Sequence, residues 1–305
     1  MLQKPLLLFK IFQQQEMKVS GFSFIRNAIR YDYPIAEAIR SIIPLCDDFY
    51  VAVGRSDDQT HELVGSIDPK IRILQTVWDD SLKKGGRVLA VETDKAFHAI
   101  PEDSNWCFYI QADEVVHEKY LEVIREAMLK WKDDPDVDGL LFKYYHFFGS
   151  YDYIATAPNW YRHEIRVIKN NKSIYSYRDA QGFRKANNKK LRVKPIDAYV
   201  YHYGWVKHPE IQVMKHKEFR RLYHGDKNGD TRFYKASEFD YSVIDALGRF
   251  DGTHPEVMQS RIKLQNWKFD RDLSFHKMSL KNRFKSFFEK KFGIIPGEYR
   301  NYRIV

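Results

Sequence analysis

The most informative segment of this chain is Trp106-Cys107-Phe108-Tyr109-Ile110-Gln111-Ala112-Asp113-Glu114-Val115-Val116. It is an apolar run of strand length that ends in two adjacent carboxylates, Asp113 and Glu114. A buried strand carries such residues where it leaves the sheet, and in open α/β sheets ligands bind at this exit. Carboxylate oxygens at that edge suit Mg²⁺ or Mn²⁺ bridging a phosphate. Alternatively, one carboxylate caps a helix predicted from Glu118 to about Trp131.

Around this segment, apolar runs of strand length alternate with helical periodicity. Strands are predicted at 18–25, 49–54, 71–77 and 106–110, and helices at 34–43, 57–67, 87–100 and 118–131. This order predicts an α/β fold with a mainly parallel sheet, right-handed crossovers and flanking helices. Further strands are predicted at 139–148, 164–169 and 199–204. Because no helix separates the first two of these, we expect a mixed edge.

The composition indicates a large folded domain with an appendage. The 305 residues are 44% hydrophobic and 15% aromatic, which is enough to bury a sizeable core. We expect an N-terminal extension at 1–16, an α/β domain at 17–205 and a helical, basic C-terminal extension at 206–305. The two cysteines, Cys46 and Cys107, lie in apolar surroundings without metal or redox spacing, which favours a reduced, cytoplasmic protein.

Positive charge gathers at the C-terminal end. Residues 261–305 contain twelve Lys/Arg and four Asp/Glu, so they carry +8 of the formal net charge of +9. Because the rest of the chain is nearly neutral, we expect an anionic partner for the tail alone and no nucleic-acid partner. Residues 279–292 place phenylalanines at helical spacing between cations. This segment is predicted either to lie on an anionic membrane or to pack on the α/β domain with its lysines in water.

The exit of the first predicted strand lacks the two commonest nucleotide-binding patterns. Ser23-Phe24-Ile25-Arg26-Asn27 contains neither the glycine-rich dinucleotide motif nor a P-loop. This argues against those two nucleotide folds and leaves one that holds a diphosphate through a metal ion.

Four short segments occur in a meaningful order. They are Phe24-Ile25-Arg26-Asn27, Gly54-Arg55-Ser56-Asp57-Asp58-Gln59-Thr60, Gly85-Gly86-Arg87 and Gln111-Ala112-Asp113-Glu114. In this order they resemble the family-2 glycosyltransferases with the GT-A fold, especially the branch near lipopolysaccharide-core and cell-envelope sugar transferases. The last segment resembles Asp-Ala-Asp-Glu, the metal-binding DXD motif of that family. The resemblance spans about residues 18–205 and implies that 17–205 is a GT-A catalytic domain.

The resemblance implies an inverting, metal-dependent transfer of a sugar from a nucleotide-diphosphate donor. Asp113 and His202 would hold Mn²⁺ or Mg²⁺, although His202 could equally be a structural residue of its strand. The residues implied in binding the nucleotide sugar are Arg26, Asn27, Ser56, Asp57, Asp58, Arg87, Gln111 and Glu114. The general base that such a reaction needs would be Asp179, with Glu164 as the alternative. Asp179 could instead be a solvated carboxylate paired with Arg178 or Arg184.

The sequence also departs from the family pattern. Gln111 replaces the first aspartate of the metal motif, and Val53 stands where an aspartate usually holds the nucleotide base. Near relatives place a His-Glu pair where this chain reads Arg178-Asp179-Ala180-Gln181-Gly182-Phe183. The sugar, the nucleotide base and the identity of the general base therefore stay open.

The predicted function is transfer to a cell-envelope glycan or a lipid-linked saccharide, by a cytoplasmic protein in peripheral contact with the inner face of the membrane. Two alternatives remain. A nucleotidyltransferase also ends its strands in carboxylates, but it usually has a glycine-rich basic loop after the first strand, which this chain lacks. A non-enzymatic basic protein that binds nucleic acid or a membrane surface is the other alternative.

Overall fold

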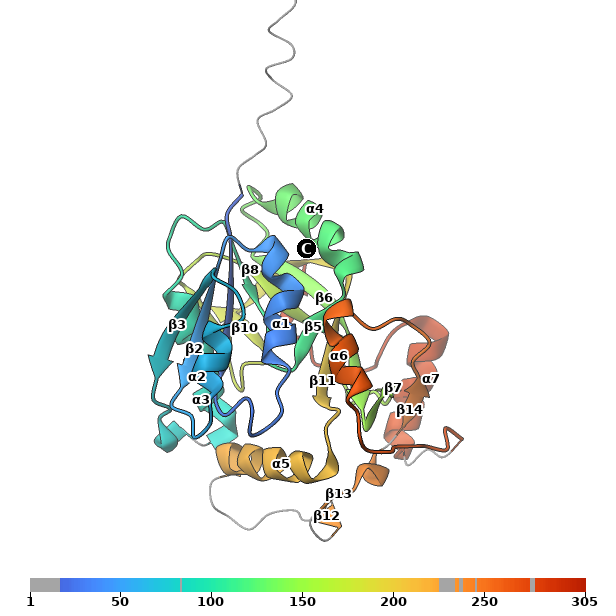
Figure 1. Ribbon diagram of the computed structural model, residues 1–305. Coiled ribbons are helices and arrows are strands. Elements are labelled where there is room, and N and C mark those ends of the chain that lie inside the picture. Colours follow the sequence, from blue (N-terminus) through green and yellow to red (C-terminus); the bar gives the residue numbers. More distant parts are fainter. Residues whose placement is uncertain (1–16, 83, 225–233, 236–237, 245, 275–277) are drawn as a thin grey trace, which may run out of the picture.

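The computed structural model describes residues 17–82, 84–224, 234–235, 238–244, 246–274 and 278–305. The N-terminal extension expected at 1–16 lies outside this described part of the chain. Helices flank one large sheet, and a further helix, α5 (Pro209–His224), runs across the end at which the first strand finishes (Figure 1).

The centre of the sheet is formed by neighbouring strands in the order β3, β2, β1, β4, β8, β6 and β11. Their bounds are β1 (Val19–Ile25), β2 (Asp48–Gly54), β3 (Ile71–Thr76), β4 (Trp106–Tyr109), β6 (Gly139–Phe148), β8 (His163–Lys169) and β11 (Lys189–Trp205). The first four neighbours are parallel, β8 runs antiparallel to β4 and to β6, and β6 and β11 are again parallel. The prediction of an α/β fold with a largely parallel, mixed sheet is confirmed.

Strand β4 is buried on both faces because its side chains enter two different cores. Trp106 and Phe108 belong to one core, and Cys107 and Tyr109 belong to the other. Successive side chains of a strand point to opposite faces, so a strand that is covered on both sides needs an unbroken apolar run. This requirement explains the apolar sequence that precedes the two carboxylates.

The helices cover these two cores from opposite sides of the sheet. The first core is covered by α1 (Ile35–Ile42), α2 (Thr60–Gly65) and α4 (Leu121–Trp131), and the second by α3 (Arg87–His98). Helix α1 shows how the sequence produces this packing, since Ile35, Ala38, Ile39 and Ile42 recur at helical spacing and are all buried. The predicted helices are confirmed, with shorter bounds at 57–67, where the helix begins only at Thr60.

Several short strands that the sequence pattern did not predict extend the sheet. They are β5 (Glu114–Val116), β7 (Ser150–Ala155), β9 (Ile174–Tyr177), β10 (Gly182–Lys185), β14 (Leu247–Arg249) and β15 (Tyr302–Ile304). The strand predicted at 199–204 is the end of the longer β11, whose first half alternates polar and apolar residues. Its pairing with β6 shifts register between Pro195 and Tyr199, as expected where proline interrupts a strand.

The C-terminal residues contain both helices and strands. Besides α5 they form α6 (Gln259–Lys263), α7 (Leu280–Phe292) and a small hairpin of β12 (Tyr234–Lys235) and β13 (Glu238–Phe239). Strand β14 pairs with β7, and β15 pairs with β11. The expected boundary at 205/206 therefore separates segments that share one sheet. None of the helices in the described part of the chain combines the length and apolar character needed to cross a bilayer.

Candidate functional site

A cleft of about 240 Å³ lies where the central strands end and α5 covers them. Arg26 follows β1, Gln111 and Asp113 follow β4, and all three line this cleft. Helix α5 contributes several side chains to the opposite wall, namely Gln212, Lys215, His216, Glu218, Phe219, Leu222 and Tyr223. We call this feature the strand-end cleft. Its position matches the general rule that open α/β sheets bind ligands at the carboxyl ends of their strands.

Asp113 is a nearly buried carboxylate at the floor of the cleft, with 8% of its surface exposed. Its backbone carbonyl accepts a hydrogen bond from the Tyr203 amide at 2.8 Å, which ties the loop after β4 to β11. Its Oδ2 accepts a hydrogen bond from Lys215 Nζ at 2.9 Å, and its Oδ1 lies 3.8 Å from His202 Nε2. Burial alone would raise the pKa of Asp113, but the Lys215 ammonium group holds it well below its ordinary value.

Gly204 permits this close arrangement. A Cβ atom at position 204 would lie 2.6 Å from His202 Nε2 and 2.7 Å from Asp113 Oδ2. A larger residue would therefore displace both side chains. The Tyr-Gly-Trp sequence that ends β11 is thus a requirement of the site as well as of the strand.

Lys215 reaches Asp113 from α5 and is itself buried, with 7% exposed. Its Nζ donates a second hydrogen bond to the carbonyl of Gly204 at 2.8 Å. A second buried lysine, Lys207, lies close by, and both ammonium groups are 4.9 Å from the centre of the Tyr33 ring. Burial and the neighbouring Lys215 lower the pKa of Lys207 to about 7.

The residues around Asp113 do not fit the divalent cation that the resemblance implied. Within the described ranges, no group of three or more His, Cys, Asp or Glu side chains could hold a metal ion. The side-chain amide of Gln111, which stands where the family has a metal-binding aspartate, donates to the carbonyl of Ala180 at 2.9 Å. A cation on Asp113 would stand against the Lys215 ammonium, and like unit charges ~4 Å apart repel by about 4 kcal/mol at an effective dielectric constant of about 20.

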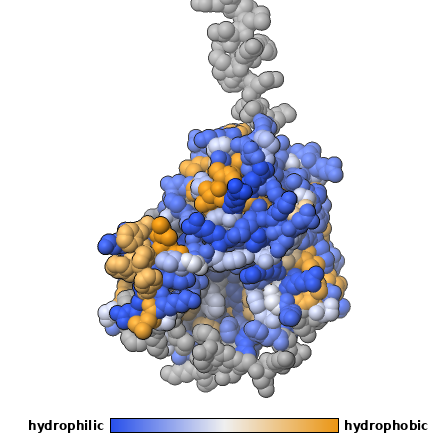
Figure 2. All heavy atoms as spheres, turned by 180° about the vertical axis from the view of Figure 1, so that it is seen from behind, coloured by the Kyte–Doolittle hydropathy of each residue, from blue (hydrophilic) through white to orange (hydrophobic). Residues whose placement is uncertain are grey.

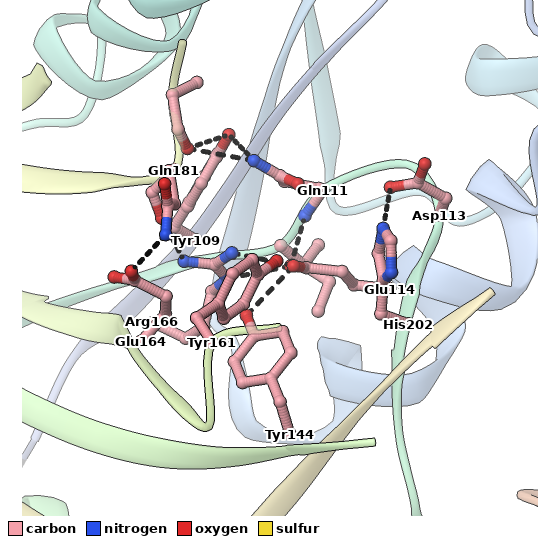
Figure 3. A network of polar contacts seen from close by, with 12 residues as sticks. Tyr109, Gln111, Asp113, Glu114, Tyr144, Tyr161, Glu164, Arg166, Gln181 and His202 are labelled. Carbon is pink, nitrogen blue, oxygen red and sulfur yellow. Dashed lines mark hydrogen bonds and ion pairs between the residues drawn. The ribbon is translucent and has the colours of Figure 1, made fainter. Parts of the chain in front are cut away.

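Glu114 points away from the cleft, into the core. Its two carboxylate oxygens accept hydrogen bonds from Arg166 at 2.7 and 2.8 Å and from the Tyr144 hydroxyl at 2.9 Å (Figure 3). Its Oε2 also accepts from the backbone amide of Gln111 at 3.1 Å. Because these partners use the carboxylate, Glu114 holds the loop after β4 in place, and it does not line the cleft.

His202 is part of a buried pair of histidines. Its Nδ1 lies 3.2 Å from Nδ1 of His146, and Nε2 of His146 lies 2.8 Å from the carbonyl of Tyr161. A carbonyl only accepts, so His146 carries its hydrogen on Nε2 and accepts from His202 at Nδ1. Burial lowers the pKa of both rings, which favours their neutral forms.

Arg26 lies against an aromatic wall of the cleft. Its guanidinium stacks over Trp78 at 4.1 Å from the ring centre and forms an ion pair with Glu218 of α5. Trp78 follows β3, and its Nε1 is buried without a hydrogen-bond partner among the described residues. The same holds for Oε1 of Gln212 on α5. Buried polar atoms without a hydrogen-bond partner are uncommon in folded proteins.

The other residues expected at the nucleotide join two loops to each other. Ser56 accepts from the Asn27 amide at 3.0 Å, and Asn27 Oδ1 accepts from the Asp57 amide at 2.8 Å. Asp58 accepts from the Arg30 amide at 2.8 Å. These side chains do not line the strand-end cleft, and Asp57 is exposed at the surface. Their role in donor binding stays a prediction, as does that of Arg87, which lines an adjoining hollow.

Asp179 lines both the strand-end cleft and that adjoining hollow. Its Oδ2 accepts a hydrogen bond from the Tyr223 hydroxyl at 2.6 Å. The flanking residues Arg178 and Ala180 have φ angles of 58° and 65°, in the left-handed region that non-glycine residues rarely adopt. Such conformations cost about 1–3 kcal/mol each and cluster at functional sites. The chain is therefore held in an unfavourable conformation that presents Asp179 to the cleft.

Glu164, the alternative base, lies behind the cleft wall. It is 2% exposed, and its Oε1 accepts from the Gln181 amide at 2.7 Å. Burial raises its pKa to about 8, although Arg166 acts in the opposite direction. The structure thus brings Asp179 to the cleft and leaves Glu164, as a mostly protonated side chain at neutral pH, in the core.

Sequence reasoning missed Lys215, Lys207, Trp78 and Tyr223. Helical spacing could have found part of the α5 wall, since Gln212, Lys215, Phe219 and Leu222 fall on one face of a helix that starts at Pro209. The pairing of Lys215 with Asp113 has no local signal, because 102 residues separate them.

No protein-family model matches the sequence, and no curated protein matches it. Similar solved structures include S. aureus TarS 1–349, at 16% sequence identity and a TM-score of 0.39, covering 68% of this chain and 64% of that one. The same TarS fragment is also known in complex with UDP.

Another is glucosyl-3-phosphoglycerate synthase from Mycobacterium tuberculosis with Mn²⁺, UDP and glucosyl-3-phosphoglycerate, at 15% identity and a TM-score of 0.29. That match covers 45% of this chain and 46% of the other. The present chain thus spans less than two thirds of either protein. Likeness at these TM-scores carries no inference about function.

Proposed function

We propose that this protein is a glycosyltransferase that takes a sugar from a nucleotide-diphosphate donor bound in the strand-end cleft. The observation that carries the proposal is that one cleft is lined by two cationic side chains and by a carboxylate, Asp179, that is held by the Tyr223 hydroxyl. Lys215 and Arg26 supply positive charge at the strand ends, and Asp179 lines the same cleft. The two cationic side chains would stabilise the negative charge that develops on the departing diphosphate, and Asp179 would take the proton of the attacking hydroxyl.

The donor would lie along the cleft floor. Its nucleotide would contact the aromatic wall of Trp78 and Arg26, and its diphosphate would face Lys215. Trp78 and Gln212 both line this cleft, and each carries a buried polar atom without a partner among the described residues. Neither the nucleotide base nor the sugar is specified by these contacts.

The reaction proposed is a single displacement. The acceptor hydroxyl gives its proton to Asp179 while its oxygen attacks the anomeric carbon, and the bond from that carbon to the diphosphate oxygen breaks. The nucleoside diphosphate leaves with the electron pair of that bond, and the sugar inverts its configuration. Tyr223, which donates to Asp179 at 2.6 Å, holds the carboxylate in position. The Mn²⁺ or Mg²⁺ expected from the resemblance has no step in this scheme.

A donor screen tests the proposal. UDP-, GDP- and dTDP-sugars are offered to the full chain with and without Mn²⁺, and released nucleoside diphosphate is measured. Release from at least one donor supports the proposal. Release of pyrophosphate from a nucleoside triphosphate and a sugar phosphate would indicate a nucleotidyltransferase instead, and a salt-sensitive gel shift without turnover would indicate a nucleic-acid-binding protein.

The acceptor side of the proposal rests on α7. Its apolar side chains Leu280, Phe284, Phe287 and Phe292 are each more than half exposed. They form an apolar patch at the edge of the molecule, seen at the left of Figure 2, which shows the molecule from behind. Arg162 binds Glu289 at 2.7 Å and so fixes the helix to the domain. We place this helix against an anionic membrane surface at the cytoplasmic face, with a lipid-linked saccharide or cell-envelope glycan as acceptor.

A further inference from the structure

We propose that the ammonium group of Lys215 takes the place of a divalent cation and binds the diphosphate of the donor directly. The inference rests on the proposed function, because it assigns the part of the donor that meets this side chain. It replaces the metal assignment that the resemblance gave to Asp113 and His202. Asp113 then acts as a positioning residue that holds the lysine.

The position of Lys215 supports this assignment. Its Nζ donates to Asp113 Oδ2 at 2.9 Å and to the Gly204 carbonyl at 2.8 Å. An ammonium group has three N–H donors, so one remains for a ligand in the cleft that this side chain lines. The rings of Tyr33 and Phe219 lie 4.9 and 5.4 Å from Nζ and restrict its movement. The charge is therefore fixed before any ligand enters.

The charges around Asp113 also favour an anion over a further cation. Asp113 is already neutralised by Lys215, which donates to its Oδ2 at 2.9 Å. The position where a second metal-binding carboxylate would stand is occupied by Gln111, whose amide donates to a carbonyl. Glu114, the remaining carboxylate of the segment, is used by Arg166. A diphosphate here meets the remaining N–H donor of the Lys215 ammonium group, whereas a divalent cation meets that ammonium group and a carboxylate already paired with it.

Binding of nucleoside diphosphates and of inorganic pyrophosphate tests the inference. Affinities of UDP, GDP, dTDP and pyrophosphate for the full chain are measured by calorimetry, in EDTA and in Mn²⁺. We expect binding in EDTA that Mn²⁺ changes by less than about twofold. Lys215→Met should weaken it roughly 10- to 100-fold, the effect of losing one charge-assisted hydrogen bond. Lys215→Arg should retain most of the affinity, and Lys217→Met, an exposed change on the same helix, should match the wild type.

The outcomes separate this inference from the proposed function. Nucleotide binding that requires Mn²⁺ and is unaffected by Lys215→Met would overturn the inference and leave the glycosyltransferase assignment standing. No binding of any nucleoside diphosphate or nucleotide sugar, with or without metal, would overturn both. If circular dichroism shows that Lys215→Met does not fold, the inference is tested by nucleotide binding in EDTA and in Mn²⁺, measured on the wild type and on Lys215→Arg.

Discussion

Glu114 and Arg166 form an ion pair with no exposed side-chain surface, with nitrogen–oxygen distances of 2.7 and 2.8 Å. The pair lies directly behind Asp113, so the residue that faces the cleft and the residue that anchors it are neighbours in the chain. A turn separates β4 from β5 here, closed by a hydrogen bond from the Glu114 backbone amide to the Gln111 carbonyl at 3.1 Å. Asp113 lies in this turn and faces the cleft, whereas Glu114 begins β5 and points into the core. The two carboxylates of this segment therefore have different tasks.

We predict that Glu114→Gln lowers the free energy of unfolding by about 3–5 kcal/mol, because it leaves the Arg166 guanidinium buried without its anion. Urea denaturation measures the change. The double variant Glu114→Leu with Arg166→Met should be less destabilised than the single one, since it removes both charges. If Glu114→Gln is as stable as the wild type and only donor binding suffers, Glu114 contacts the ligand after all.

Replacing Asp179 tests the proposed base. Asp179→Asn should reduce kcat by about 10²–10⁴-fold and leave the donor affinity nearly unchanged, because the base acts on the acceptor. Glu164→Gln is the matched control, since it removes a carboxylate that lies outside the cleft. Equal rates for Asp179→Asn and the wild type, together with an inactive Glu164→Gln, would move the base to Glu164.

Glu164 should also make stability depend on pH. Its pKa is raised to about 8 in the folded chain by burial, against an ordinary value of 4.5. The folded state therefore holds this proton more tightly than the unfolded state, and stability falls as the pH rises from about 5 to 8. We expect Glu164→Gln to become several kcal/mol more stable relative to the wild type over this range in urea titrations. A difference that stays constant with pH would show that Glu164 is ionised in the fold.

The placement of α7 predicts salt-sensitive membrane binding. The protein should sediment with vesicles that contain anionic lipid and be released at high salt, because α7 presents cations beside exposed phenylalanines. Phe284→Ser with Phe287→Ser should reduce sedimentation and leave activity on a soluble acceptor unchanged. Vesicles that never retain the intact protein would place the acceptor elsewhere.

Local pattern was sufficient to predict the parallel half of the sheet. The apolar run of β4 and the helical spacing of α1 are each encoded within a few residues. Strands such as β10 and β15 were missed because they are short and owe their pairing to distant segments.

Only the part of the site that directly follows a single strand could be predicted from the sequence. Asp113 was found because a carboxylate ends a buried run, but its partner comes from α5, 102 residues away. Glu114 and Arg166 are likewise 52 residues apart, so the sequence could not show that their charges are used in the core. The metal ion was expected from the Gln111-Ala112-Asp113-Glu114 motif alone. The partners of its two carboxylates, Lys215 and Arg166, are seen only in the folded chain.

A crystal structure with a bound nucleoside diphosphate tests the central claim most directly. We predict density for the nucleotide in the strand-end cleft, with its diphosphate within hydrogen-bonding distance of Lys215 Nζ and its base or ribose against Trp78. Full occupancy of the ligand at another surface, or an empty cleft at saturating nucleotide, would contradict the account.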